Sequence, residues 1–146
     1  MKVCQNLQSL SIQHCPRFES ETLVSVLSIL QPLTHLDLTG NNSLKNEVLD
    51  CIAKYHGSQL SFLGLNSLDL LDDFSPLSKL TKLREFDISW IRGVHDELLL
   101  DFFTKTAPLL EKIWVFGCTL LSREFLERHW KNGNEKRIVI LGNEFD

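Results

Sequence analysis

The sequence predicts an α/β solenoid in which about six parallel strands lie side by side on a concave face and helices cover the convex face. A short apolar motif recurs six times along the 146 residues. Most intervals between the copies carry apolar residues at helical spacing. Leucine contributes 28 of the 146 residues, and these leucines recur with the period of the motif. Together the three observations predict a stack of similar strand–helix units.

The motif is L-x-x-L-x-L-x-x-N, and residues 33–41 match it at every defined position. Related copies begin at residues 7, 60, 83, 110 and 135, so neighbouring copies are 26, 27, 23, 27 and 25 residues apart. In an extended strand, successive side chains point to opposite faces. Positions four and six of each copy therefore form one apolar face, and positions three, five and seven form a solvated face.

The intervals between the strands predict four helices and one shorter turn. Apolar stripes at helical spacing fall within residues 23–30, 48–55, 94–102 and 125–130, and we expect each to face the core. Asp96 and Ser122 are the expected N-caps of the last two helices. The third interval, residues 72–77, leaves room for only a turn or two of helix.

The ninth position of the motif predicts how each repeat is closed. Asn41 is expected to point inward at the turn and to hydrogen-bond backbone groups that would otherwise be buried without a partner. Cys15 and Cys118 fill the same position as small side chains that can be buried. With Cys4 and Cys51, they make four scattered cysteines without zinc spacing or a signal peptide. All four are therefore expected to be reduced, intracellular thiols.

The repeat length of about 26, with Cys15-Pro16 and Gly117-Cys118 after the strands, resembles the cysteine-containing subclass of leucine-rich repeats. That subclass occurs in F-box ubiquitin-ligase receptors and in the leucine-rich subunit of the yeast nucleotide-excision-repair complex. The tail, residues 110–118 followed by a helix and residues 137–143, resembles the C-terminal part of that repair subunit. The resemblance covers nearly the whole chain and implies a leucine-rich-repeat horseshoe.

The domain organisation and the partners also follow from this resemblance. Residues 1–146 are expected to form a single leucine-rich-repeat domain. No polar cap precedes residue 7, so we expect either the C-terminal portion of a longer solenoid or a start that a partner covers. The family implies a nuclear protein that binds a repair ATPase of the helicase kind and cullin- or elongin-type ligase components.

Strand positions three, five and seven predict a partner-binding surface on the concave face. In the last repeats, large apolar side chains lie beside cations, as in a protein-binding hot spot. The candidate residues are Phe62, Glu85, Asp87, Trp90, Lys112, Trp114, Phe116, Arg137, Val139 and Leu141, of which Trp90 is added from position eight. The spacing puts Arg137, Val139 and Leu141 at positions three, five and seven of the sixth copy. The alternative is local: the tail with Phe145, or the region of Trp130, folds over this end and caps it.

Composition and motifs argue against several other functions. The net charge is −4 and the pI is about 5.7, so the surface is not built to wrap nucleic acid by charge alone. No apolar run reaches the ~18 residues of a membrane span, and no catalytic or zinc-binding motif occurs. We therefore predict a non-catalytic protein-recognition scaffold that needs no cofactor or metal.

Two alternatives to this function remain open. The first is direct nucleic-acid binding by a basic C-terminal edge, although interleaved glutamates favour an ordinary solvated helix. The cations of this edge are Arg123, Arg128, His129, Lys131, Lys136 and Arg137. The second and weaker alternative is proton transfer by His35 and Asp37, which share the solvated face of one strand.

Overall fold

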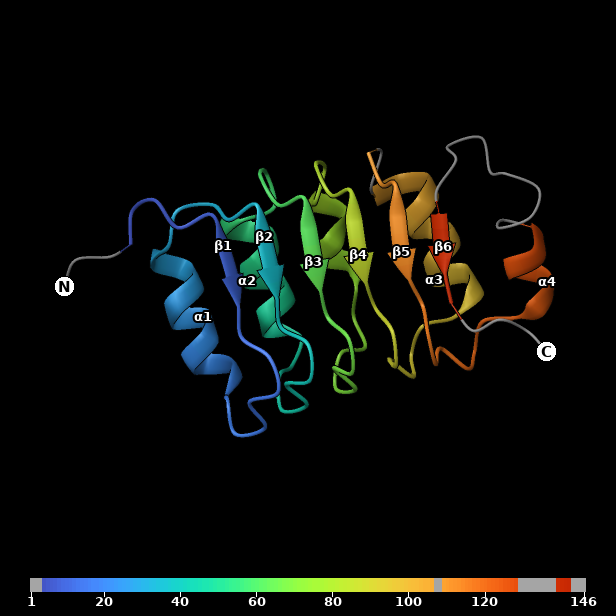
Figure 1. Ribbon diagram of the computed structural model, residues 1–146, viewed down its shortest axis with the longest axis horizontal. Coiled ribbons are helices and arrows are strands. Elements are labelled where there is room, and N and C mark those ends of the chain that lie inside the picture. Colours follow the sequence, from blue (N-terminus) through green and yellow to red (C-terminus); the bar gives the residue numbers. More distant parts are fainter. Residues whose placement is uncertain (1–3, 107–108, 129–138, 143–146) are drawn as a thin grey trace.

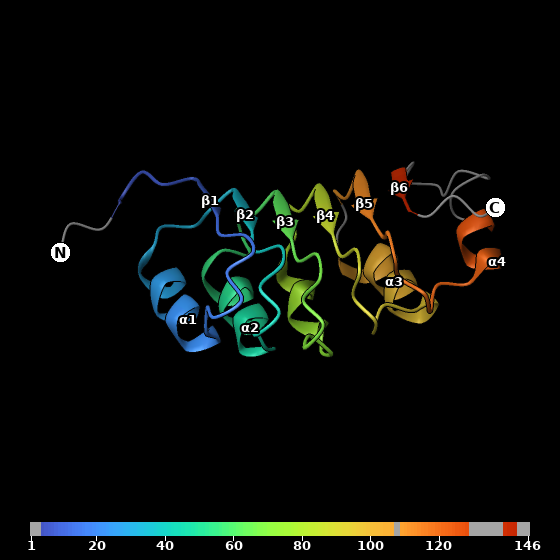
Figure 2. The ribbon, with the colours of Figure 1, turned by 60° about the horizontal axis from the view of Figure 1, so that its bottom comes forward.

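The computed structural model describes residues 4–106, 109–128 and 139–142, and it has two layers. Figure 2 shows the strands along one side and the helices along the other, in the order in which they occur in the chain. We refer to the strand side as the concave face and to the helix side as the convex face. The predicted leucine-rich-repeat solenoid is confirmed.

The strands form one six-stranded parallel sheet in sequence order, as Figure 1 shows. The strands are β1 (Ser9–Ser11), β2 (His35–Asp37), β3 (Phe62–Gly64), β4 (Glu85–Asp87), β5 (Lys112–Trp114) and β6 (Val139–Leu141). From β1 to β5, each strand covers positions three to five of its motif, so the repeat itself sets the register.

The intervals between the strands form helical elements of different lengths. The elements are α1 (Ser20–Ile29), α2 (Glu47–Tyr55), the 3-10 helix η1 (Ser75–Lys79), α3 (Asp96–Asp101), the π-helical turn η2 (Phe102–Thr106) and α4 (Arg123–Leu126). The short third interval was predicted correctly. Ser122 is the N-cap of α4, as expected, because its side chain accepts a hydrogen bond from Phe125 N. The prediction for α3 is wrong by one residue, since His95 is its N-cap.

The core lies between the two layers. The apolar residues at motif positions one, four and six of the second and third copies are fully buried, as is Asn41 at position nine of the second. Burying one such leucine contributes roughly 1.5–3 kcal/mol, so the repeated leucines are the main driving force for stacking. In the first copy, Leu10 and Ile12 are only half-buried, because β1 has a strand neighbour on one side alone.

A left-handed residue at motif position eight follows every strand from β1 to β5, three residues after the strand ends. His14, Gly40, Ser67, Trp90 and Gly117 occupy this position with φ between 53° and 77°. In the first four copies, the backbone N–H of this residue donates to the position-seven carbonyl of the next repeat, at 2.6–2.9 Å. Because three of the five residues are not glycine, the repeat geometry imposes this conformation, whatever the residue type.

The sixth copy has a different register from the predicted one. Val139 pairs with Lys112, so Val139 stands at position three and Leu141 at position five. The sequence suggested positions five and seven because Ile138 and Ile140 also fit the apolar pattern. A slip of two residues keeps the alternation of faces, so Val139 and Leu141 remain on the concave side.

The cysteines of the described residues are free thiols, as predicted. Cys118 is buried, and its Sγ lies 3.3 Å from the carbonyl oxygen of Ile88 in the preceding repeat. Cys15 occupies the same motif position but is exposed, which corrects the expectation that it would be buried. It belongs to the first strand, which no strand covers on its outer side.

Candidate protein-interaction face

The parallel register arranges the concave face in two rows of side chains. The position-three row contains Ser9, His35, Phe62, Glu85, Lys112 and Val139. The position-five row contains Ser11, Asp37, Gly64, Asp87, Trp114 and Leu141. Strands lie about 4.8 Å apart, so six of them span roughly 24 Å. A helix of ~10 Å diameter or an extended segment fits across this width.

Three rings and one ammonium group meet at the centre of the face. We call His35, Phe62, Trp114 and Lys112 the aromatic line. The His35 and Phe62 rings stack with their centroids 4.1 Å apart and their planes 8° apart. Phe62 meets Trp114 edge to face at 6.3 Å, and Lys112 Nζ lies 5.2 Å from the centroid of the Trp114 ring. All four residues are half-buried, so contacts on this face hold the rings while part of each remains open to solvent.

Gly64 makes room for these rings within the position-five row. A Cβ atom built at Gly64 would lie 2.6 Å from Asp37 Oδ1 and 3.3 Å from Phe62 Cε1. Any side chain there would displace one of these two groups. Gly64 therefore belongs to the site, although the repeat motif assigns it no role.

The acidic residues of the face are largely held by neighbours. Glu85 Oε2 lies 3.8 Å from Lys112 Nζ. Asp87 Oδ1 accepts the backbone N–H of Ser89 at 2.9 Å, two residues further along the chain. Asp37 Oδ1 accepts Thr39 N in the same way, at 3.0 Å. The Asp-x-Ser/Thr spacing is a turn signal that could have revealed this structural role from the sequence.

Trp90 and Phe116 extend the face beyond the carboxyl ends of the strands. The exposed fractions of the two residues are 58% for Trp90 and 40% for Phe116. Trp90 N donates to Phe116 O at 2.6 Å, and the Trp90 ring occupies the space that a side chain on Gly117 would need. Trp90 thus lies in a turn against the next repeat, outside the two strand rows.

The last strand continues the apolar part of the face. Val139 is 49% exposed and Leu141 is half-buried. Arg137 lies outside the described residues, as do Trp130 and Phe145 of the alternative in which the tail caps the sheet. The choice between an interface and a local cap therefore stays a prediction.

The described part of the basic edge consists of paired charges. Arg123 Nε lies 2.9 Å from Glu127 Oε1, and Arg128 lies 2.9 Å from Glu124 Oε1. The other cations of this edge, His129, Lys131, Lys136 and Arg137, fall outside the described residues. Ion pairs four residues apart are typical of a solvated helix face.

Catalytic or metal chemistry finds no support in the described part of the chain. His35 stacks on Phe62, and both oxygens of Asp37 accept hydrogen bonds, from Thr39 N and from Gln13 Nε2. Within residues 4–106, 109–128 and 139–142, no group of three or more potential metal ligands occurs. Likewise, none of the helices described is long and apolar enough to cross a bilayer.

The adjacent carboxylates Asp72 and Asp73, which precede η1, have a local structural role. Asp73 Oδ1 accepts Ser75 N at 2.9 Å, and hydrogen bonds with Ser75 lower the pKa of the Asp73 carboxyl. Asp72 Oδ1 accepts a hydrogen bond from Asn46 Nδ2 of the preceding repeat.

His35 was not among the residues predicted to bind a partner. The signal was available, because His35 and Phe62 both stand at position three of neighbouring copies. In a parallel pair such residues lie side by side, so an aromatic pair there predicts stacking.

Comparisons with known proteins agree with this architecture. The chain is 30% identical to the DNA repair protein rhp7 of Schizosaccharomyces pombe over 117 residues, which cover 80% of the chain and 16% of rhp7. It also matches a crystal structure of the Rad7 and Elc1 complex in yeast with a TM-score of 0.77 and 20% identity. That match covers 94% of the chain and 33% of the matched chain. No family model matches the chain.

These matches confirm the resemblance inferred from the motifs. The chain is a leucine-rich-repeat solenoid related in sequence to a DNA repair protein, and it spans about a sixth of the length of that relative.

Proposed function

We propose that this chain is a non-catalytic recognition module that binds a protein partner through its concave face. The observation that supports this proposal is the aromatic line, in which Phe62 and Trp114 from strands two positions apart meet beside Lys112. Half-buried rings beside a cation are the features that dominate protein–protein hot spots. Ring contacts worth roughly 0.5–1.5 kcal/mol each hold this arrangement before a partner arrives, which lowers the entropy lost on binding.

We further propose that the partner belongs to a DNA repair or ubiquitin-ligase complex in the nucleus. Two findings support this assignment: the similarity to a DNA repair protein, and a fold shared with Rad7 in its complex with Elc1. A repair ATPase and cullin- or elongin-type ligase components are the candidate partners implied by the resemblance.

The shape of the face favours a partner that presents an apolar segment with an acidic flank. Phe62 and Trp114 offer ring surface, and Lys112 together with the exposed Phe116 extends it toward β6. A carboxylate of the partner would compete with Glu85 for Lys112, which is only loosely paired at 3.8 Å.

Affinity purification of the intact protein from its own cells tests this function. Co-purifying proteins are quantified by mass spectrometry for the unmodified protein and for Trp114→Ala, Phe116→Ala and Ile29→Ala. Ile29 is the matched control, because it is an apolar residue that is 55% exposed at the end of α1 on the opposite face. Circular dichroism shows that each variant folds.

Repair or ligase components should co-purify with the unmodified protein and with Ile29→Ala. We expect recovery at least tenfold lower with Trp114→Ala, since losing a buried hot-spot ring weakens binding by ~1.4 kcal/mol or more. If both Trp114→Ala and Phe116→Ala retain every partner, the concave-face assignment is wrong. Direct binding of duplex DNA that weakens steeply with salt would instead favour nucleic-acid recognition.

A further inference from the structure

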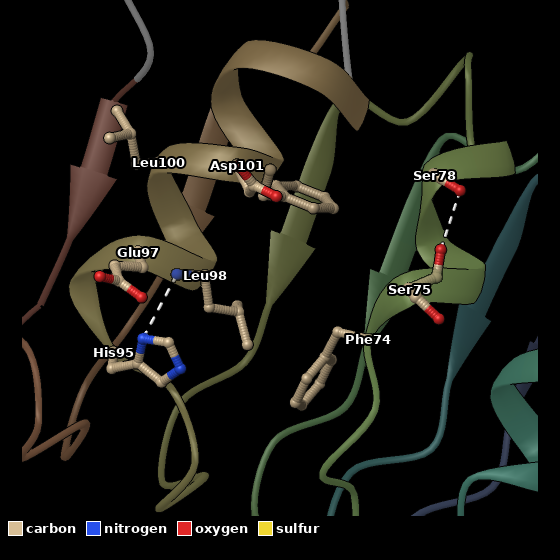
Figure 3. A pocket seen from close by; sticks show the side chains of 9 residues that line it. Phe74, Ser75, Ser78, His95, Glu97, Leu98, Leu100 and Asp101 are labelled. Atoms are coloured by element: carbon tan, nitrogen blue, oxygen red, sulfur yellow. Dashed lines mark hydrogen bonds between the residues drawn. The ribbon is translucent and has the colours of Figure 1, made fainter.

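A groove of about 670 Å³ opens on the convex face, away from the aromatic line. Figure 3 shows Leu98 of α3 and Phe74, just before η1, pointing toward each other across it. Phe102 forms part of the floor and is 4% exposed. The volume of the groove falls in the range of roughly 300–1,000 Å³ that is typical of ligand-binding pockets.

The short third repeat creates this groove. The third and fourth copies are 23 residues apart, the shortest of the five spacings. Consequently η1 has only five residues, whereas α1 has ten and α2 has nine. The layer of helices is therefore thinner between α2 and α3, and Phe74 and Leu98 remain half-buried where a longer helix would cover them.

The charged side chains that line this groove are of one sign. Glu97 lies in the first turn of α3, and Asp101, four residues further on, is the last residue of that helix. Both side chains are exposed. No lysine or arginine occurs among the described residues that line the groove. An apolar floor with an acidic rim complements a ligand that carries apolar groups and positive charge.

We propose that the groove binds a basic amphipathic helix from a partner protein. Its apolar side chains contact Phe74 and Leu98, and its lysines and arginines lie over Glu97 and Asp101. Helices surround the groove and no strand edge lines it, so an extended peptide would find no backbone ladder to join. A bound helix would complete the layer that η1 leaves incomplete. This site is separate from the concave face and does not depend on the function proposed for it.

Fluorescence-anisotropy titrations with three synthetic peptides test the proposal. All three are amphipathic helices with the same leucine and phenylalanine face, and their polar face is lysine–arginine, glutamine or glutamate. The chain is titrated unmodified, as Glu97→Lys/Asp101→Lys, and as the control Glu47→Lys/Asp50→Lys. The control pair is also exposed and helical, and it changes the net charge equally, but it lies on α2 outside the groove.

The basic peptide should bind at least tenfold more tightly than the acidic one. The Glu97→Lys/Asp101→Lys variant should lose that preference, while Glu47→Lys/Asp50→Lys and Trp114→Ala should keep it. Equal binding of the three peptides, or equal losses in both charge-reversed variants, would overturn the proposal, because a general attraction to the chain's net negative charge would then explain any binding. Since Trp114→Ala tests the concave face alone, the two proposals can fail independently.

Discussion

Asn41 joins the first two repeats through hydrogen bonds from its buried side chain to their backbone. It is fully buried, its Nδ2 donates to Ile12 O at 2.6 Å and Leu38 O at 2.7 Å, and its Oδ1 accepts Cys15 N at 2.9 Å. One side chain thus satisfies polar groups from two successive strand ends, as the motif predicted.

Replacing Asn41 should therefore destabilise the fold substantially. Asn41→Ala leaves two carbonyls and one N–H without their partner, and each buried unsatisfied group costs roughly 1–3 kcal/mol. We expect the free energy of unfolding, measured by urea denaturation, to fall by about 3 kcal/mol. Asn42→Ala, at the exposed neighbouring position, should change it by less than about 0.5 kcal/mol. Equal effects of the two substitutions would show that Asn41 does not link the repeats.

The four cysteines should differ sharply in reactivity. Burial raises the pKa of the Cys118 thiol to about 11, and burial also raises the pKa of Cys51. At pH 8 only about one Cys118 in a thousand is the reactive thiolate. Cys4 and Cys15 are exposed.

Brief treatment of the folded chain with iodoacetamide, followed by mass spectrometry, should label Cys4 and Cys15 and leave Cys51 and Cys118 unmodified. Unfolding in urea should make all four react. Rapid labelling of Cys118 in the folded chain would contradict the burial of the ninth motif position.

At the scale of elements, His56 links the first two helices and the segment that leads into β2. It is fully buried directly after α2, its Nδ1 accepts Leu33 N at 3.0 Å, and its Nε2 lies 2.9 Å from Leu27 O at the end of α1. Nδ1 acts as an acceptor, so the ring is neutral and Nε2 carries the proton. Desolvation by burial lowers the pKa of His56 below its ordinary value of 6.5.

This lowered pKa predicts a loss of stability in mild acid. Well above pH 6.5, His56 is neutral in both the folded and the unfolded chain, so its contribution to the free energy of unfolding is fully present. Below pH 6.5, the unfolded chain binds a proton that the folded chain does not, so the free energy of unfolding decreases by up to about 1.4 kcal/mol per pH unit. Urea titrations between pH 7.5 and 5 should show this decrease. It should be smaller in His56→Gln and unchanged in His14→Gln, which alters an exposed ring. A His56→Gln profile identical to that of the unmodified chain would contradict this role.

The strands could be predicted far better than the helices. Position four fixes each strand, because its residue from Leu36 to Ile140 must enter a continuous core. The register of the sixth copy was predicted wrongly, because its alternating apolar residues fit two registers that differ by two residues. The N-cap of α3 was misplaced because Asp96 and His95 both carry acceptors, and only the geometry selects between them.

At the scale of the whole molecule, regular stacking produces the concave face and one shortened repeat produces the convex groove. Regular stacking aligns positions three and five into the concave rows, so the sequence alone could place Phe62, Lys112 and Trp114 on one face. It could not show that Phe62 and Trp114 touch across β4, since that depends on side-chain length and on the absence of a side chain at Gly64. The convex groove could not be predicted from the sequence either, because it arises where the short η1 lies between the longer helices α2 and α3.

Hydroxyl-radical footprinting of the chain, alone and with the partner recovered by affinity purification, tests the central claim most directly. It reports the solvent exposure of individual side chains by their oxidation. We expect the oxidation of Phe62, Trp114 and Phe116 to decrease when the partner binds, while the oxidation of Ile29 on α1 stays unchanged. Protection confined to the helices, with Trp114 oxidised as fast as in the free chain, would contradict recognition through the concave face.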